Sequence, residues 1–275
     1  MEIRYPSNPN DFGAYSTDRI RSEFLLQDLF TRGVLALTYS HFDRMIIGGI
    51  CPFEPLQLTA SKELGTEYFL ERREMGIINV CSQGKVIVDD QAFELNPSDG
   101  LYIGKNAREV VFTSLDPENP AHFYMLSGPA HQQYPTVKVT QAEADKNHLG
   151  TPEEANVRTI HKYIHPDGVL SCQLVMGITV LESGSVWNSM PCHTHERRME
   201  AYFYFDLNPN AVLLHLMGKP DNTRHIVMRN EEAVISPSWS IHAGAGTSNY
   251  AFIWGMLGDN QAFSDMDAVP MGELK

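Results

Sequence analysis

Short apolar runs separated by turn-forming residues recur along most of the chain. Between residues 33 and 128 these runs are rich in β-branched and aromatic side chains, and Gly, Pro, Asn or Asp bounds them. The pattern predicts strands at VLALTYS, RMIIGGI, GIINVCSQ, GKVIVDD, AFEL, GLYIG and EVVFTSL. Many short strands at this spacing favour a β-sandwich or a β-barrel.

A second series of strand-like runs follows a polar stretch. The polar stretch contains a capping-box pair, Thr140 and Glu143, which predicts one short helix there. Strand patterns then resume at CQLVMGITVLE, EAYFYFD, AVLLHLMG, RHIVMR, EAVISPS and YAFIWGM. We therefore expect an all-β protein with two domains, residues 1–140 and 158–275, joined by a linker at 141–157.

Helical spacing of apolar residues occurs near the N-terminus. Residues 17–30 read TDRIRSEFLLQDLF, and their apolar side chains fall on one stripe of a helix. This segment predicts one short amphipathic helix in an otherwise β-rich chain.

The two halves also resemble each other. YFLERREMGII begins at Tyr68 and HTHERRMEAYF begins at His193, and both contain Glu-Arg-Arg ahead of a strand. FYMLSG at 123–128 similarly matches FIWGMLG at 252–258. We interpret this similarity as an internal duplication.

Composition narrows the classes of function. The chain has 275 residues, 43% of them hydrophobic and 20% charged, which is typical of a folded globular protein. A formal charge of −13 argues against a nucleic-acid-binding surface, which needs clustered Lys and Arg. A small anionic substrate stays compatible with this charge, because one or two local Arg side chains can bind a single carboxylate.

The expected compartment is the cytoplasm. No run of about 18 apolar residues is present to cross a membrane. The first residues lack the basic and then apolar pattern of a signal peptide. The four cysteines are widely spaced and form no Cys-x-x-Cys pair, which favours free thiols in a reducing compartment.

Four residues of the second domain have the side chains and spacing of a metal site. His193 and His195 are two residues apart, so on a strand both imidazoles lie on one face. Glu200 follows after an odd interval, which requires a turn between it and His195. His242 comes later, after Pro237. Three imidazoles and one carboxylate suit Zn²⁺, Mn²⁺, Fe²⁺ or Ni²⁺.

The spacing of these residues, H-x-H-x(4)-E followed by P-x(4)-H, resembles the paired motifs of the cupins, small β-barrels that hold a metal through three His and one Glu. The resemblance implies two cupin-type barrels in tandem. In the first domain Tyr68, Leu70 and Met75 stand at the positions of His193, His195 and Glu200. Arg108 stands near the position of His242, so the first barrel is expected to be metal-free.

Longer motifs resemble one cupin family. TYSHFDRMIIGGI, NSMPCHTHERRMEAYFYF, TRHIVMRNEEAVISPSWSIHAGAGT and FIWGMLGDNQAF look like the 5-keto-4-deoxyuronate isomerase family over nearly the whole chain. The resemblance implies a zinc-dependent aldose–ketose isomerase of pectin and uronate degradation, with His193, His195, Glu200 and His242 as ligands. It also implies a homohexamer and a reaction through an enediolate.

Other residues near the motif are candidates for catalysis and substrate binding. Glu196, Tyr202 and His225 are candidates for the base that moves the proton. Arg197 and Arg198 are candidates for binding the substrate carboxylate, although a solvated turn explains them equally well.

Two further side chains near the motif can be explained either by a role at the site or by packing in the fold. Tyr204 shares the inward face with Tyr202, and at least one of the two is expected to pack in the core. Cys192 precedes His193 and is either a fifth ligand or a small neighbour that faces away from the metal.

Three other functions compete with this interpretation. The related 5-deoxyglucuronate isomerase of inositol breakdown also acts on a deoxyuronate. Cupins with the same ligands can also hold Fe²⁺ and act as oxygenases, and a third alternative is a non-catalytic sugar-binding or sensor protein. No helix-turn-helix or other output segment fits the sequence, so we rank the third alternative last.

Overall fold

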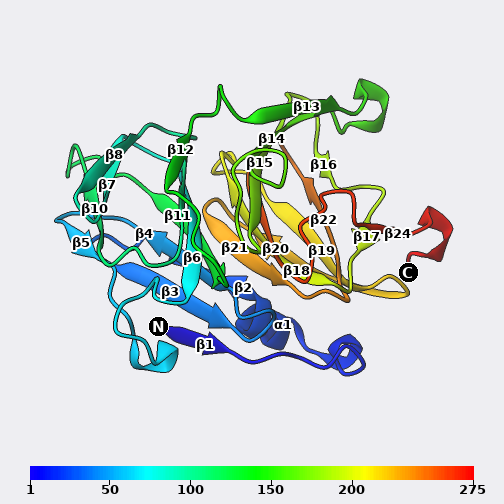
Figure 1. Cartoon of the computed structure of the whole chain (residues 1–275). Coiled ribbons are helices and arrows are strands. Elements are labelled where there is room, and N and C mark those ends of the chain that lie inside the picture. Colours follow the sequence, from blue (N-terminus) through cyan, green and yellow to red (C-terminus); the bar gives the residue numbers. More distant parts are fainter. The chain divides into compact units, whose positions relative to one another are not determined.

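The chain is built almost entirely of β-strands, as the sequence predicts. The computed structural model describes residues 1–275 and contains one α-helix, α1 (Thr17–Phe24), together with four short 3₁₀ turns. These turns are Phe12–Ala14, Lys62–Leu64, Pro152–Glu154 and Met271–Glu273. No helix has the length and apolar character needed to cross a membrane. Figure 1 shows the strands and the helix along the chain.

The first of two compact units comprises Met1–Arg4, Asp28–Ala144 and Tyr163–Met176. Its seven-stranded sheet has the order β1 (Glu2–Arg4), β3 (Leu35–Ser40), β4 (Ile46–Ile50), β11 (Phe123–Pro129), β6 (Arg73–Asn79), β9 (Gly100–Ile103) and β12 (Val137–Val139). Its four-stranded sheet has the order β5 (Leu56–Gln57), β10 (Val110–Ser114), β7 (Gly84–Val88) and β8 (Gln91–Leu95).

The second unit comprises Tyr5–Gln27, Asp145–Lys162 and Gly177–Lys275. Its seven-stranded sheet has the order β13 (Asp145–Leu149), β14 (Arg158–Ile164), β15 (Val175–Leu181), β23 (Ala251–Gly258), β18 (Arg198–Phe205), β21 (Glu232–Ser236) and β2 (Leu25–Leu26). A four-stranded sheet has the order β16 (Trp187–Asn188), β22 (Ile241–Gly246), β19 (Leu213–Lys219) and β20 (Asn222–Met228). The short strands β17 (His193–Thr194) and β24 (Asp267–Ala268) pair with each other.

The five inner strands of the large sheets have the same order in both units, and β3, β4, β11, β6 and β9 correspond to β14, β15, β23, β18 and β21. In each seven-stranded sheet, the strand that begins at the last arginine of the Glu-Arg-Arg motif pairs with the long strand at the centre of the sheet. In the first unit β6 pairs with β11, so that Met75 lies opposite Ser127. In the second unit β18 pairs with β23, so that Glu200 lies opposite Met256. The repeated topology is what an internal duplication produces.

Neither unit is continuous in sequence, and this differs from the predicted division at residues 140 and 158. Residues 5–27 belong to the second unit because β2 completes its large sheet, with Leu25 opposite Val234. Residues 163–176 belong to the first unit. There the buried Glu74 carboxylate accepts hydrogen bonds from the backbone N–H groups of residues 172–174, at 2.6–3.0 Å.

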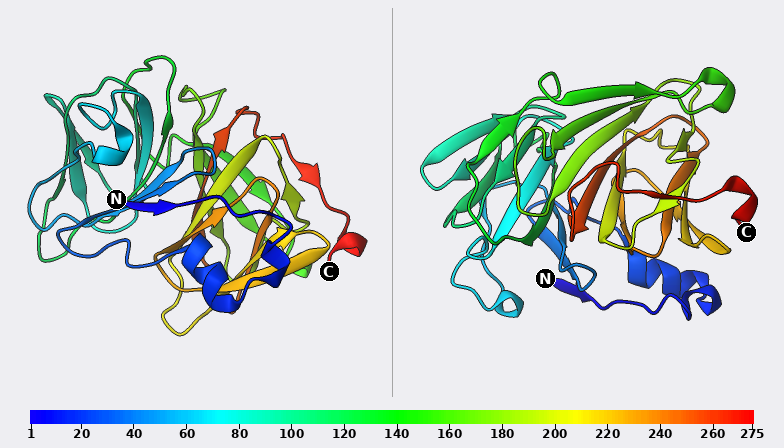
Figure 2. Two further views of the ribbon diagram at one scale, coloured as in Figure 1. Left: turned by 90° about the horizontal axis from the view of Figure 1, so that it is seen from below. Right: turned by 45° about the vertical axis from the view of Figure 1, so that its right-hand side comes forward.

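The predicted N-terminal helix is shorter than expected. It begins after Ser16, whose hydroxyl accepts a hydrogen bond from Arg19 N (3.2 Å), and it ends at Phe24 instead of continuing to residue 30. Strand pairing at Leu25 and Leu26 ends it. The helix lies beside β20 and β21 (Figure 2). Phe24 is fully buried, and its ring makes an edge-to-face contact with Phe12.

The helix predicted in the linker does not form. Thr140 and Glu143 make the reciprocal capping hydrogen bonds, from Thr140 N to Glu143 Oε2 (3.0 Å) and from Glu143 N to Thr140 Oγ1 (3.3 Å). They close only a turn, because residues 145–149 pair with β14 as strand β13. Strand pairing therefore overrides the local helix signal.

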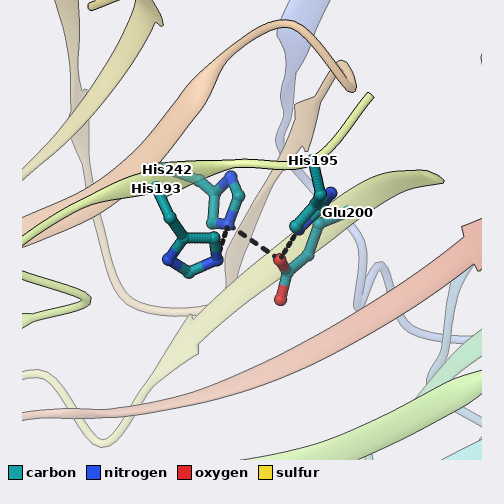
Figure 3. A group of neighbouring side chains, drawn as sticks. All are labelled: His193, His195, Glu200 and His242. Atoms are coloured by element: carbon teal, nitrogen blue, oxygen red, sulfur yellow. Dashed lines mark hydrogen bonds and ion pairs between the residues drawn. The ribbon is translucent and has the colours of Figure 1, made fainter. Parts of the chain in front are cut away.

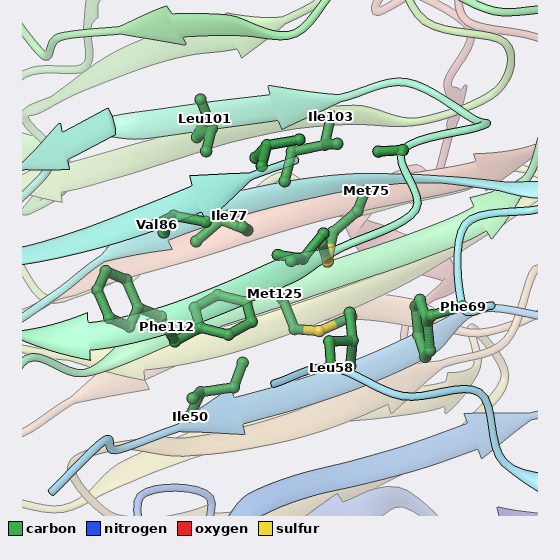
Figure 4. Packing of buried hydrophobic residues seen from close by; sticks show 14 of the residues in the cluster. Ile50, Leu58, Phe69, Met75, Ile77, Val86, Leu101, Ile103, Phe112 and Met125 are labelled. Atoms are coloured by element: carbon green, nitrogen blue, oxygen red, sulfur yellow. The ribbon is translucent and has the colours of Figure 1, made fainter. Parts of the chain in front are cut away.

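The interior of the first unit is filled with hydrophobic side chains. Figure 4 shows part of this cluster, including Phe69, Met75 and Met125. Leu70 and Met75, at the positions that correspond to His195 and Glu200, belong to it with 1% and 0% exposure. Neither offers a nitrogen or oxygen ligand. Tyr68, at the position of His193, lies instead under the Arg108 guanidinium, 4.9 Å from its ring centroid.

Candidate metal centre

Three separate segments of the second unit contribute the four predicted ligands. His193 lies on β17, and His195 follows it directly. A turn at Glu196 and Arg197, closed by Arg198 N donating to His195 O (3.3 Å), reverses the chain into β18, where Glu200 lies. This turn resolves the odd spacing between His195 and Glu200. His242 is the second residue of β22.

The four side chains converge on one point. One ligand atom from each lies within 4.8 Å of the others. Glu200 Oε2 is 3.2 Å from His195 Nε2 and 3.0 Å from His242 Nε2, and His242 Nε2 is 3.0 Å from His193 Nε2. Figure 3 shows the imidazole nitrogens and the carboxylate turned toward one another. Three residues are buried and His193 is half-buried.

Backbone carbonyls fix the orientation of two of the imidazoles. His195 Nδ1 lies 2.8 Å from Arg198 O, and His242 Nδ1 lies 3.3 Å from Ser240 O. A carbonyl oxygen only accepts, so each Nδ1 carries the hydrogen and each neutral ring presents a lone pair at Nε2. These lone pairs face the Glu200 carboxylate. A cluster of acceptors of this kind fits a bound cation, and the N₃O donor set suits a first-row divalent metal.

Burial and mutual charge shift the pKa values of these groups. Burial lowers the pKa of His193 to about 3, and His242 adds to the effect. For Glu200 burial alone raises the pKa, but the neighbouring His242 and His195 outweigh it and hold the pKa well below the ordinary carboxyl value. For His195 burial lowers the pKa, but the hydrogen bond and charge of Glu200 outweigh it and raise the pKa above the ordinary imidazole value. A bound metal would take the place of that proton, because metal ligation requires an ionised carboxylate and neutral imidazoles.

A cavity of about 250 Å³ adjoins the metal ligands. His193 and Glu200 form part of its wall, together with Tyr202 and Ser189, whose hydroxyls are 2.9 Å apart. The rest of the wall is mainly apolar and aromatic, and these residues are Leu149, Ile160, Pro191, Phe252, Trp254, Met256, Phe263 and Met266. A small, mostly apolar cavity with a few polar groups beside a metal site is a typical ligand pocket.

One of the three candidates for the base lies in this cavity. Tyr202 lines it, and burial, followed by the charge of Glu200, raises the pKa of its hydroxyl well above the ordinary value. Its phenol therefore stays protonated and can donate a hydrogen bond. Glu196 and His225 are exposed, and neither is among the residues that line the cavity.

The two predicted carboxylate-binding arginines bind protein groups. Arg197 is paired with Asp265, at 2.6 and 3.0 Å, and with Asp267 at 3.0 Å. The Arg198 side chain is fully buried and lines the cavity, but its Nη1 donates to Ala262 O (2.8 Å) and its Nη2 to Asp265 O (3.1 Å). Both arginines thus anchor the segment that precedes β24.

Other residues near the site behave as structural groups. Cys192 is buried in a small hydrophobic cluster with Ile241, Ala243 and Val269, and it is absent from the group of metal ligands. Tyr204 is buried, and its hydroxyl lies 2.8 Å from His215 Nδ1. Burial lowers the pKa of His215 to about 3, so this imidazole is neutral.

Sequence reasoning missed Arg158 and Ser189, which also line the cavity. The sequence signal for Arg158 is weak, because the residue directly follows the predicted linker at 141–157. Its strand, β14, has the alternating pattern Arg158-Thr-Ile160 that places residues 158 and 160 on one face.

The chain resembles proteins of known family along its whole length. A family model described as the KduI/IolB family matches residues 24–270. The 4-deoxy-L-threo-5-hexosulose-uronate ketol-isomerase of Caldicellulosiruptor bescii is 56% identical over 276 residues and covers 100% of both chains. The relative of the same name from Lachnoclostridium phytofermentans is 54% identical over 276 residues, also covering 100% of both chains.

Solved structures share the fold at low sequence identity. A structure of an IolB-like protein from Salmonella typhimurium has a TM-score of 0.67 at 16% identity, covering 82% of this chain and 86% of that chain. Oxalate decarboxylase from Lactobacillus farciminis, in complex with formate, has a TM-score of 0.56 at 8% identity, covering 83% and 80%. At such identities the likeness shows the fold alone, and it confirms the predicted cupin-type fold.

Proposed function

The chain belongs to the KduI/IolB family, and from this membership we propose that it is a metal-dependent ketol-isomerase acting on 5-dehydro-4-deoxy-D-glucuronate. The product would be 3-deoxy-D-glycero-2,5-hexodiulosonate, formed in the degradation of pectin and related uronates. The observation that carries the proposal is the identity of 50–56% over the full chain to relatives named as this isomerase.

The reaction moves a carbonyl group from C1 to C2 without net loss or gain of atoms. One proton leaves C2 and one is added to C1, while the hydroxyl hydrogen moves from the oxygen of C2 to that of C1. Two oxygens on neighbouring carbons must therefore be held together, and the proton must be transferred on one face of the substrate. The cavity beside His193 and Glu200 is small and mostly apolar, which suits this step.

The donor set of His193, His195, Glu200 and His242 would hold a zinc ion or another first-row divalent metal. When bound, such an ion supplies Lewis-acid stabilisation of negative charge on substrate oxygens. Two other groups of the chain fit roles beside it. Tyr202 would donate a hydrogen bond to a substrate oxygen, and Ser189, 2.9 Å from the phenol, would orient that hydroxyl.

Turnover measured together with metal content tests this proposal. We expect the purified protein to convert the 4-deoxy-5-keto-uronate, to contain close to one metal ion per chain, and to lose activity on chelation. In deuterated water the product should carry deuterium at the hydroxymethyl carbon that was C1 of the substrate, if the proton exchanges with solvent during transfer. Full activity after complete removal of metal would refute the role of the four-residue site, and absence of turnover would refute the reaction.

The second substrate to compare is 5-deoxyglucuronate, because the matching family description joins KduI with IolB and the solved IolB-like protein shares the fold. Both compounds should be assayed at equal concentration with the same metal-loaded sample. We expect a higher kcat/KM for the 4-deoxy-5-keto-uronate. Oxygen uptake during the assay would instead support the oxygenase alternative.

The assembly and location follow from the same proposal. We infer a homohexamer in the cytoplasm, with one metal ion in each second unit and no partner other than the small uronate. Light scattering of the purified protein at micromolar concentration would measure the mass of the assembly, and a monomer would contradict this part of the proposal.

A further inference from the structure

We propose that Arg158 binds the carboxylate of the substrate, at the end of the cavity remote from the metal ligands. This inference rests on the proposed function, because it takes the ligand to be a uronate. It assigns the anion-binding role to an arginine outside the Glu-Arg-Arg motif.

The cavity lies against one face of the large sheet of the second unit. Side chains that alternate along the strands line it, from Arg158 and Ile160 on β14 to Glu200 and Tyr202 on β18. In the sheet order, β15 and β23 lie between these two strands and contribute Thr179 and Trp254.

Three inter-strand steps of about 4.8 Å therefore separate β14 from β18. A long arginine side chain and a six-carbon acid, placed end to end, can together span the distance between these two strands. A substrate with its C1 and C2 oxygens at the metal ligands would then direct its carboxylate, at C6, toward Arg158.

Arg158 is a half-buried cation without an ion-pair partner. Its Nη1 donates to Asn156 O (2.8 Å). Burial lowers its pKa, and Tyr202, Tyr250 and the carboxylate of Glu154 act in the opposite direction. A guanidinium in a partly desolvated pocket has its remaining donors available for a bound carboxylate, which it can grip with two parallel hydrogen bonds.

The guanidinium Nη atoms of the other two arginines near the site are already engaged, and only the Arg198 Nε has no partner. Arg197 is paired with two aspartates, and the Nη atoms of Arg198 are bonded to backbone carbonyls of the segment before β24. In a chain of net charge −13, Arg158 is thus the cavity cation whose hydrogen-bonding capacity is least used by the protein. Local positive charge of this kind is what would select a monoanionic sugar acid from neutral sugars.

The test compares Arg158→Gln and Arg158→Lys with the wild type, and Arg229→Gln as the control. Arg229 is an exposed arginine of the same unit that does not line the cavity. We expect Arg158→Gln to lower kcat/KM for the uronate by roughly 10- to 100-fold, chiefly through KM, because it removes a charged hydrogen bond. Arg158→Lys should retain part of the activity, since it keeps the charge but loses the planar fork.

Two readouts separate carboxylate binding from a merely structural role. Added methylguanidinium should restore activity to Arg158→Ala. The methyl ester of the substrate should react at similar rates with the wild type and with Arg158→Gln, because the ester has no charge to bind. Metal content and melting temperature should be the same in all variants. An unchanged KM in Arg158→Gln, or equal losses for acid and ester, would overturn the proposal.

A binding arm keeps this inference separate from the proposed function. Calorimetry with D-glucuronate and D-glucose on the metal-loaded protein should show tighter binding of the acid to the wild type, and no preference in Arg158→Gln. If the wild type prefers D-glucuronate over D-glucose no more strongly than Arg158→Gln does, the proposed role of Arg158 is wrong. Absence of uronate turnover by the wild type would refute the reaction, while the calorimetry would still decide whether Arg158 holds a carboxylate.

Discussion

The Glu200→Gln substitution tests the metal centre with little change of shape. Glutamine has nearly the volume of glutamate but lacks its negative charge. In the structure one carboxylate oxygen lies 3.2 Å from His195 Nε2 and 3.0 Å from His242 Nε2. The charge is thus removed at the point where two imidazole lone pairs converge, while the fully buried strand around it keeps its packing.

The expected magnitude follows from linkage between metal binding and folding. Loss of groups that merely orient metal ligands weakens metal affinity about 10- to 100-fold, so loss of a direct ligand should weaken it at least about 100-fold. At a free metal concentration near 1,000 times the wild-type dissociation constant, the metal stabilises the wild type by about 4.1 kcal/mol. The variant would then be at about 10 times its own constant and would gain about 1.4 kcal/mol.

The difference of about 2.7 kcal/mol is measurable by melting with and without metal. For a folding unit of this size it corresponds to roughly 5–10 °C less metal-dependent rise in Tm. Glu232→Gln is the matched control, because Glu232 is a buried carboxylate of the same unit that accepts from Arg229 N (2.7 Å) and lies outside the metal group. The control should keep the metal-dependent rise. A Glu200→Gln variant with wild-type metal content and the full rise would refute the assignment of Glu200 as a ligand.

Three further substitutions test other parts of the structure. Glu74→Met introduces the residue type found at the corresponding position of the second unit, Met199. It leaves the backbone N–H groups of residues 172–174 without their acceptor. The substitution should therefore lower the free energy of unfolding, measured by denaturant titration, by about 3–5 kcal/mol. Retention of wild-type stability, with unchanged hydrogen exchange at those amides, would contradict this account. Phe24→Ala removes a fully buried ring and should lower the free energy of unfolding by about 3–5 kcal/mol in the same titration. A decrease below about 1 kcal/mol would mean that the helix contributes little to the stability of its unit. Tyr202→Phe removes the hydroxyl near Ser189 and should lower kcat by roughly 10- to 100-fold with unchanged metal content, whereas an unaltered kcat would exclude the phenol from the reaction.

Local sequence patterns were enough to predict the fold class and the four side chains that converge at the candidate metal centre. Alternating apolar positions and turn residues fix strands one at a time, and this information is local. The spacing of His193, His195 and Glu200 also required a turn, and the structure has that turn at residues 196 and 197. The internal duplication could be read from the repeated Glu-Arg-Arg motif, because both copies keep the same strand after it.

Pairing between distant segments decided the remaining features. Whether residues 25–30 continue a helix or join a sheet depends on the free edge of β21, which the local pattern does not contain. In the same way β14 is available to pair with residues 145–149, so a capping box that is complete in its hydrogen bonds still closes only a turn. Sheet hydrogen bonds with a partner far along the chain outweigh a helix nucleus that one turn provides.

The sequence by itself determined which side chains could bind a metal, because ligand chemistry and strand parity are properties of the residues. Only the tertiary structure decided which charged side chains face the cavity. Arg197 and Arg198 lie beside the ligands in sequence, yet the segment before β24 engages them. Arg158, some forty residues away, is brought to the cavity wall by the order of strands in the sheet. Such contacts arise from chain segments that meet only on folding, and no local pattern carries them.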